Sequence, residues 1–243
     1  MGTLQFGDQQ FAYRVRRTNR KKTIGITVKA SWEVILHVPY RTPEEKIRQV
    51  VRKKAGWIVK RLQHLAESPK AYPAKEYISG EQLLYLGRSY RLKIEQTTGN
   101  GCTTPALIGR RLCLSVGEKL DGQKKRETIK NRLKTWYGQQ ADRIIKERVK
   151  RYAPLLEAHP AEIKIRDQKT RWGSCSTSGT IRFNWRVVLA PMKIIDYVVV
   201  HELCHLKVKN HSREFWRQVA LIFLDHKERR AWLRTNSRLL RIE

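Results

Sequence analysis

The chain has 243 residues, and its 51 lysine and arginine residues outnumber its 22 acidic residues, which gives a formal net charge of +29. This length allows one large hydrophobic core or two smaller ones, and the hydrophobic content of 40% is typical of a globular protein with a highly charged surface. No apolar run is long enough to cross a bilayer, so we expect no membrane-spanning segment.

The N-terminal half predicts a small antiparallel sheet, a helix and further strands. Apolar and polar residues alternate in segments between residues 11 and 38, which is the pattern of strands with one buried face. Thr42 is suited to cap a helix and Pro43 to occupy its first turn. Short strands are then expected around residues 82–86, 90–95 and 112–116. We therefore expect a β-rich N-terminal lobe of residues 1–120.

The rest of the chain, residues 121–243, predicts a mostly helical lobe. Apolar residues recur at helical spacing through the basic segment 124–156, which indicates a long helix with one buried side. Strands are expected at 162–166 and 180–189, and residues 212–240 are expected to be helical. The predicted fold class is α+β: an N-terminal antiparallel lobe with a helix, then a mostly helical lobe with a small β-sheet.

The motif His-Glu-Leu-Cys-His at residues 201–205 carries the clearest chemical signal in the chain. Residues four apart on a helix lie on nearly the same side, so the imidazoles of His201 and His205 can bind one metal ion. Glu202 lies about 100° around the helix from His201, where its carboxylate flanks the metal instead of binding it. The largely apolar segment 192–200 predicts that this helix is buried. The pattern is that of a catalytic zinc site.

His211 is the expected third ligand. A continuous helix would turn His211 about 240° away from His205, so the helix must end after roughly Leu206 and the chain must turn back. Glu214 is the alternative third ligand, because zinc enzymes also use two histidines and a glutamate. Three protein ligands leave one coordination position for water or substrate, which distinguishes a catalytic zinc site from a structural one.

A family resemblance is carried by several motifs together. They are the segments 171–176 (Arg-Trp-Gly-Ser-Cys-Ser), 181–186 (Ile-Arg-Phe-Asn-Trp-Arg), 189–191, 201–205 and 211–216. In these motifs, and over nearly its whole length, the chain resembles the YgjP-like family, which is related to the SprT and WLM metallopeptidases. The resemblance implies a zincin-like metallopeptidase lobe that binds Zn²⁺ through His201, His205 and His211, with Glu202 as the general base.

The leading functional hypothesis is cleavage of peptide bonds in a protein or peptide substrate. Glu202 would take a proton from the metal-activated water and pass it to the leaving amine. An extended substrate is expected to lie along the strand at 180–189, with Arg171 and Asn184 as candidate contacts. For these two residues, roles in turn and sheet packing are equally open. Tyr197, one helical turn before His201, or an arginine would stabilise the oxyanion of the transition state.

The net charge predicts an anionic partner, and nucleic acid is the commonest one. Aromatic residues such as Trp57, Trp136, Tyr137 and Trp216 lie within basic runs, where they would either stack on bases or face inward as core residues. No helix-turn-helix or zinc-finger motif is present, so no sequence specificity is expected. The four cysteines form no C-x-x-C pair and the first residues show no secretion signal, so we expect a cytoplasmic protein.

Two other functions stay open from the sequence. The first is a metal-dependent phosphohydrolase or pyrophosphatase acting on nucleoside triphosphates, which the positive field favours although no Walker-type loop is present. The second is a nucleic-acid-binding module whose zinc is structural.

Overall fold

The computed structural model describes residues 2–240 except 22, 30, 68–74, 100 and 169. Contacts divide the chain into two compact units, Met1–Pro69 and Lys70–Glu243. The boundary expected at residue 120 falls inside the second unit. The reason is that the strands between residues 82 and 117 share one hydrophobic core with the long helix that follows them.

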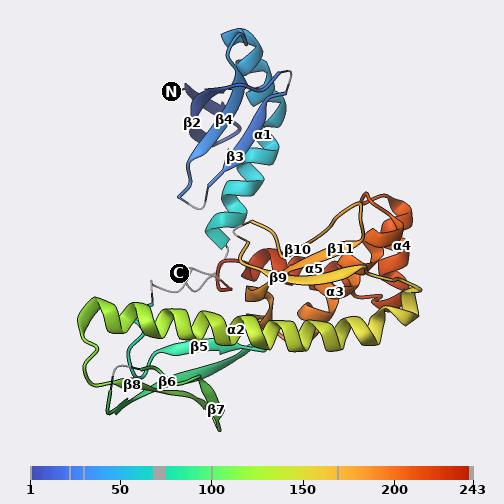
Figure 1. Cartoon of the computed structure of the whole chain (residues 1–243). Helices are drawn as coiled ribbons and strands as arrows, with labels where there is room; N and C mark the ends of the chain where they lie inside the picture. Colours follow the sequence, from blue (N-terminus) through green and yellow to red (C-terminus); the bar gives the residue numbers. More distant parts are fainter. Residues whose placement is uncertain are drawn as a thin grey trace. The chain divides into compact units, whose positions relative to one another are not determined.

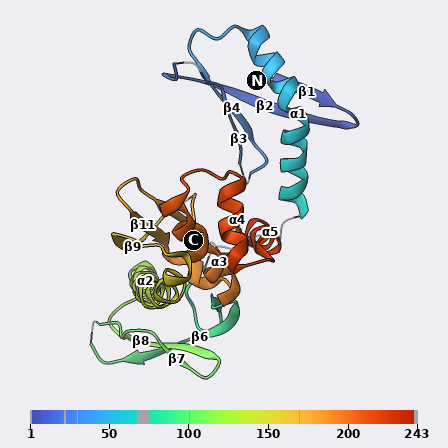
Figure 2. The ribbon, with the colours of Figure 1, turned by 90° about the vertical axis from the view of Figure 1, so that its right-hand side faces the viewer.

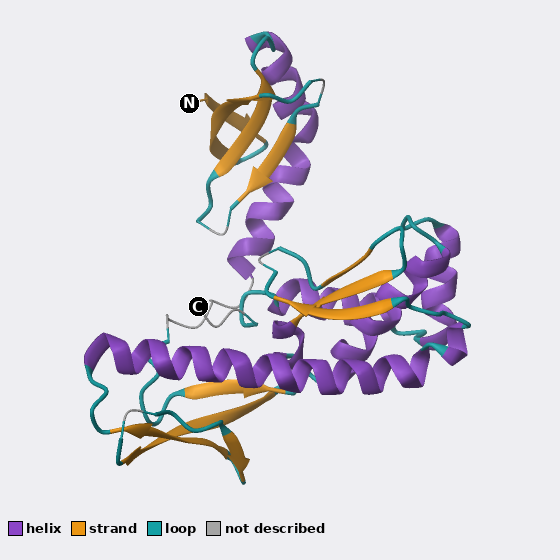
Figure 3. Ribbon diagram, viewed as in Figure 1, coloured by secondary structure: helices purple, strands orange, loops and turns teal. Residues whose placement is uncertain are grey.

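The first unit is a four-stranded sheet packed against one helix (Figure 3). Its elements are β1 (Gly2–Phe6), β2 (Gln9–Thr18), β3 (Gly25–Val28), β4 (Val34–Pro39) and α1 (Glu44–Glu67). The strand order is β1-β2-β4-β3, and β2 runs parallel to β4. The expected all-antiparallel sheet is therefore wrong at this pair. Alternation of apolar residues reports which face is buried, but not which strand is the neighbour or in which direction it runs.

The second unit begins with a sheet of the same topology. It contains β5 (Gln82–Tyr85), β6 (Arg88–Thr97), β7 (Ala106–Ile108) and β8 (Arg111–Gly117) in the order β5-β6-β8-β7, followed by α2 (Gly122–Tyr152). Tyr13 lies opposite Val34 in the parallel pair of the first sheet, as Leu92 lies opposite Leu112 in the second, and all four are buried. The chain thus builds the same sheet-and-helix arrangement twice.

A three-stranded sheet, three α-helices and two short 3-10 helices complete the described part of the second unit. They are η1 (Pro154–Leu156), β9 (Glu162–Arg166), β10 (Gly173–Cys175), β11 (Thr180–Asn184), η2 (Trp185–Leu189), α3 (Met192–Lys207), α4 (Arg213–Ile222) and α5 (His226–Asn236). Helix α2 lies between this part and the β5–β8 sheet (Figures 1 and 2). None of the helices within the described residues has the length and apolar character needed to cross a membrane.

The strand expected at 180–189 is shorter than predicted and lies in the middle of its sheet. The order is β10-β11-β9, with β11 antiparallel to β10 and parallel to β9. The strand ends at Asn184, because the side chain of Asn184 accepts a hydrogen bond from the Arg186 N–H and starts the 3-10 turn η2. Both edges of β11 are paired, so the expectation that a substrate adds to this strand is wrong.

The hairpin turn between β5 and β6 docks on the segment that leads into α3. The N–H of Leu86 donates to the carbonyl of Val188 (2.7 Å), and the N–H of Gly87 donates to the carbonyl of Leu189 (3.1 Å). Gly87 has a φ of +76°, and a Cβ at this position would lie 2.6–2.9 Å from atoms of Pro191. Only glycine therefore fits here, both in conformation and in space.

Candidate metal centre and catalytic site

Helix α3 presents the motif from a rigid, buried position. Its residues between Ile194 and Val200 are buried, as the apolar pattern predicted. The Arg148 guanidinium of α2 contacts the Asp196 carboxylate through Nε (2.5 Å) and through a second nitrogen (3.0 Å), and both side chains are largely buried. A bidentate ion pair of this kind fixes orientation as well as distance. The N-terminal half of α3 is thus held against α2.

The three predicted histidines converge on one point. His201 and His205 lie on α3, which ends at Lys207, and His211 follows in the loop before α4. Each offers one ring nitrogen, and these nitrogens lie within 4.8 Å of one another. The Nε2 atoms of His201 and His211 are 3.0 Å apart. Ligand nitrogens about 2.0–2.1 Å from a tetrahedral zinc would be about 3.4 Å apart, so the triad fits this ion.

The protonation of the rings suits metal binding. The Nδ1 of His205 lies 3.0 Å from the carbonyl oxygen of Val208. A carbonyl can only accept a hydrogen bond, so Nδ1 carries the hydrogen and Nε2 keeps its lone pair for a ligand role. Burial, together with the nearby His205, His211 and Arg230, lowers the pKa of His201 to about 3, so this ring stays neutral.

An aromatic side chain forms the floor beneath the triad. Phe215 of α4 is fully buried, and its ring centroid lies 4.8, 4.5 and 4.8 Å from those of His201, His205 and His211. Phe215 therefore packs against all three imidazoles and limits their rotation. The chain turns after α3 and brings His211 against Phe215. This is the helix break that was predicted after residue 206.

Glu214, the alternative third ligand, is engaged elsewhere. Its carboxylate accepts from the Gln218 amide (3.0 Å) and pairs with Arg217 (2.8 Å), both on the same helix. It is not part of the histidine cluster. The structure therefore favours His211 over Glu214 as the third member of the site.

Glu202, which follows His201 on α3, is a buried carboxyl. It is 5% exposed, and its Oε2 atom has no hydrogen-bond partner among the described residues. Burial raises the pKa of Glu202 to about 8, and the positive charge of Arg171 opposes this shift. The Glu202 side chain lies against Gly173 of β10, since a Cβ at Gly173 would be 2.6 Å from it. The carboxyl thus packs directly against the glycine backbone.

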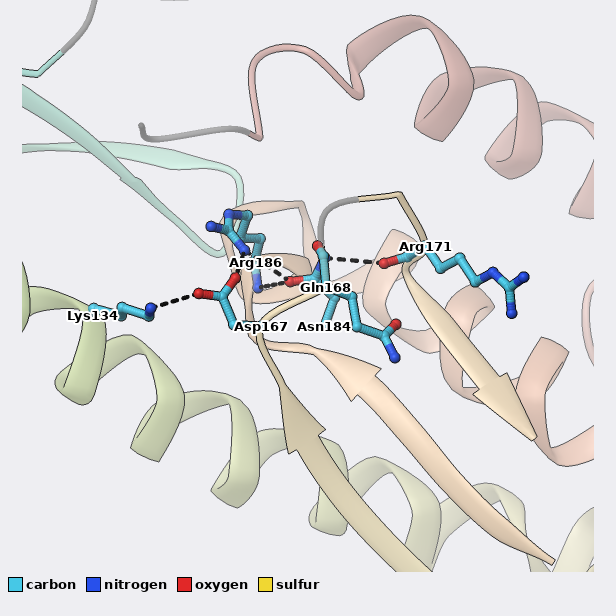
Figure 4. A network of polar contacts seen from close by, with 6 residues as sticks. All are labelled: Lys134, Asp167, Gln168, Arg171, Asn184 and Arg186. Atoms are coloured by element: carbon cyan, nitrogen blue, oxygen red, sulfur yellow. Dashed lines mark hydrogen bonds and ion pairs between the residues drawn. The ribbon is translucent and has the colours of Figure 1, made fainter. Parts of the chain in front are cut away.

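The candidate substrate contacts occupy different environments. The Arg171 side chain is exposed and points away from the polar network around Asn184 (Figure 4). Asn184 is 3% exposed, and its amide donates to the main-chain carbonyls of Gln168 and Arg171, which lie between β9 and β10. Tyr197 is buried with its ring centroid 5.8 Å from that of His201, and burial raises its pKa to about 12. Tyr197 therefore keeps its hydroxyl proton at neutral pH and remains a hydrogen-bond donor.

Two further residues border the triad that sequence reasoning did not assign to it. The Trp216 ring stacks on His211 on one side (5.7 Å, 26°) and on His226 on the other (5.4 Å, 16°). The Arg230 guanidinium lies 4.8 Å above the Trp216 ring, and its charge contributes to lowering the pKa of His201 and of His211. Trp216 is the last residue of the 211–216 motif, but nothing in the local sequence marks Arg230.

Some aromatic residues within the basic runs face inward as core residues, whereas Trp57 is exposed and could stack on bases. Trp136 and Tyr137 on α2 are buried and form part of the core. Trp216 packs at the histidine site, whereas Trp57 on α1 is 49% exposed. Stacking on nucleic acid bases is thus sterically open to Trp57 and not to the pair on α2.

Three histidine nitrogens around one point, with a buried glutamate beside them, form the arrangement typical of metal-dependent hydrolases. The family is shown by a match of the YgjP-like metallopeptidase domain to residues 22–236. The chain belongs to the YgjP-like family and is a metallopeptidase, which confirms the resemblance carried by the motifs.

Two solved structures that are similar to part of the chain are those of metallopeptidase zymogens. The metallopeptidase zymogen abylysin of Pyrococcus abyssi is 26% identical with a TM-score of 0.37, and the match covers 39% of this chain and 96% of that one. The metallopeptidase zymogen jannalysin of Methanocaldococcus jannaschii is 27% identical with a TM-score of 0.34, covering 37% of this chain and 92% of that one. No curated protein matches the chain.

Proposed function

We propose that the protein is a zinc-dependent peptidase in which His201, His205 and His211 hold the metal and Glu202 is the general base. The observation that carries this proposal is the convergence of three ring nitrogens within 4.8 Å beside a buried carboxyl. Three neutral imidazoles are a common ligand set for catalytic zinc, and they leave a position for a further ligand. Zinc bound there would lower the pKa of water and polarise the substrate carbonyl.

Glu202 handles the protons in this proposal. Its carboxylate accepts the proton of the attacking water and then gives it to the amine of the departing peptide. The free Oε2 atom is available for this transfer, because no described side chain occupies it. Glu202 loses its own proton more readily beside a bound cation, since an opposite charge stabilises the ionised carboxylate.

The substrate would bind at the edge of the three-stranded sheet. Among the described residues, β10 pairs only with β11, so its other edge is free, and Gly173 places this strand next to Glu202. An extended peptide added to β10 would gain main-chain hydrogen bonds with little dependence on its side chains. This places the peptide on β10, not on the 180–189 segment. Arg171, just before β10, remains a candidate contact for it.

Two residues are suited to stabilise the negative charge that develops on the substrate oxygen. Tyr197 keeps its proton because burial raises its pKa, and its ring lies against His201. Arg230 brings a positive charge near the triad and is itself exposed. Preorganised donors or charges of this kind contribute about 3–4 kcal/mol to transition-state binding in other hydrolases.

Replacing Glu202 by glutamine tests this function. Glu202→Gln keeps the shape of the side chain but removes its basic oxygen, so kcat for peptide cleavage should fall between about 100-fold and 10,000-fold. Zinc content and melting temperature should match the wild type. A glutamine variant that cleaves peptides at the wild-type rate would refute the assignment. Release of phosphate from nucleoside triphosphates by the wild type, without peptide cleavage, would favour the phosphohydrolase alternative.

We further propose that the basic surface recruits the enzyme to nucleic acid. The net charge of +29 creates a field that attracts polyanions. Part of this charge is exposed along the first half of α2, on Lys124, Arg126, Lys130, Arg132 and Lys134. Contacts of this kind bind phosphates without reading the base sequence.

Salt titration of DNA binding tests the recruitment. The binding constant should fall steeply between about 50 and 200 mM salt, because each phosphate contact releases counterions. The variant Lys130→Glu/Arg132→Glu should bind more weakly, and its charge-preserving control Lys130→Arg/Arg132→Lys should bind as the wild type does. Failure to bind at low salt, or binding that salt leaves unchanged, would contradict this proposal.

A further inference from the structure

A buried asparagine outside the histidine triad organises the segment that leads into β10. The Asn184 amide nitrogen donates to the carbonyl oxygens of Gln168 (2.6 Å) and Arg171 (3.0 Å), as Figure 4 shows. The main-chain N–H of Asn184 donates to the carbonyl of Trp172 (2.8 Å). One residue thus holds the carbonyls of Gln168, Arg171 and Trp172, and both hydrogens of its amide are used within the chain.

Asn184 is itself anchored on the side away from this segment. Its Oδ1 atom accepts from the N–H of Arg186 (3.1 Å) at the start of η2. The Arg186 guanidinium is buried and pairs with Asp167, whose other carboxylate oxygen accepts from Lys134 of α2 (2.5 Å). The network in Figure 4 therefore connects the long helix α2 with Asp167, Gln168 and Arg171 through polar contacts.

The residues held by Asn184 lead directly to Gly173, which lies against Glu202, the proposed general base. Gly173 follows the last of the three bonded carbonyls, and its Cα faces the Glu202 side chain so closely that a Cβ would lie 2.6 Å from Glu202 Cγ and Oε1. The Glu202 carboxyl cannot move toward β10 without meeting this backbone. Its place in the site depends on where residues 171–173 are held.

We propose that Asn184 is a positioning residue, which sets the place of the Glu202 carboxyl by holding residues 171–173 against it. This inference rests on the role proposed for Glu202. A substrate contact, the other role considered for Asn184, would require its amide to break both donated bonds. The asparagine acts through the backbone of Gly173 and does not itself meet the substrate.

The test is a double-mutant cycle between Asn184 and Glu202. Asn184→Asp removes both donated hydrogen bonds but keeps the size of the side chain. We expect kcat for peptide cleavage to fall by about 100-fold, as for a misplacement of about 1 Å, with KM within about twofold of the wild type. In the Glu202→Gln background, the same substitution should change the residual rate by less than about threefold, because the group that it positions is already absent.

Two more variants keep the result interpretable. Asn184→Ser introduces no buried charge, and its hydroxyl is too short to reach both carbonyls, so it should repeat the effect if the aspartate variant does not fold. Gln168→Ala is the matched control, because the bond from Asn184 is made to the main-chain carbonyl of Gln168 and not to its side chain. This control should have the kcat of the wild type.

Each other outcome overturns the inference. An unchanged kcat, a rise in KM alone, or an equal loss of rate in both backgrounds would show that Asn184 does not act through Glu202. A Glu202→Gln enzyme with wild-type activity would instead remove the proposed function itself, so the two failures are distinct.

Discussion

Gly173 offers the most direct structural test of the place of Glu202. In Gly173→Ala, the new Cβ would lie 2.6 Å from Cγ and Oε1 of Glu202 and 2.7 Å from Cδ, whereas ordinary contacts begin at 3.4 Å. The carboxyl or the strand must therefore shift by about 0.8 Å. A displacement of about 1 Å at a reacting group costs about 100-fold in rate, so we expect a loss of kcat of this order.

The assay is steady-state cleavage of a peptide, with zinc content and melting temperature measured in parallel. Gly138→Ala is the matched control, because a Cβ at that helical position meets no atom within 4 Å. Truncating the partner tests the cause: in a Glu202→Ala background none of the overlapping atoms Cγ, Cδ and Oε1 is present, so adding Gly173→Ala should change the residual rate by less than about threefold. A Gly173→Ala enzyme with a wild-type kcat would refute the reasoning.

Three other predictions concern stability and metal binding. Gly87→Ala should lower the free energy of unfolding by about 2 kcal/mol or more in urea titrations, because the new Cβ clashes with the proline before α3. The control Gly109→Ala, at φ +57° in open space, should lower the free energy of unfolding by less. Equal losses in the two variants would contradict this prediction. Burial raises the pKa of Asp167, but hydrogen bonds from a lysine and an arginine outweigh it and hold the pKa at about 2. Asp167→Asn should therefore cost about 1 kcal/mol at pH 7, reduced by the partial exposure of the carboxylate, and the difference from the wild type should disappear as the pH falls from about 4 to about 2; a constant difference would refute the pairing. His211→Ala should weaken zinc binding at least about 100-fold in competition with a chelating dye, while Glu214→Gln should not; the reverse result would make the glutamate the ligand.

The histidine site was predictable because its information is local. Two histidines four apart on a helix must share a face, and His211 could join them only if the helix stopped, as it does at Lys207. The helix starting near Thr42 and the long basic helix were also marked by capping residues and apolar spacing, and the structure has them at Glu44–Glu67 and Gly122–Tyr152.

The sheet connections were not predictable in the same way. Alternation marks the buried face of β2, but its parallel pairing with β4 depends on a crossover through β3, and the same holds for β6 and β8. The repeated topology is therefore visible only in the pairing, not in the motifs. The two units divide at residue 69 and not at the expected residue 120 for the same reason. The second sheet packs on α2, and this long-range contact could not be predicted from local patterns.

The sequence did not mark Arg230, and it suggested a different role for Asn184. Arg230 lies 25 positions after His205 in the sequence, and the packing of α5 is what brings its charge near the triad. Asn184 looked like a strand residue facing a substrate, but its short amide side chain caps η2 and ends the strand. Asparagine favours such local hydrogen bonds to the main chain, and this preference overrode the alternating pattern.

The central claim is that His201, His205 and His211 bind one zinc ion and that catalysis depends on it. Protein stripped with a chelator and titrated with zinc should regain peptidase activity in proportion to the metal added, with saturation at one ion per chain by elemental analysis. Full activity in the stripped protein, or the same stoichiometry and activity after all three histidines are replaced by alanine, would contradict the account.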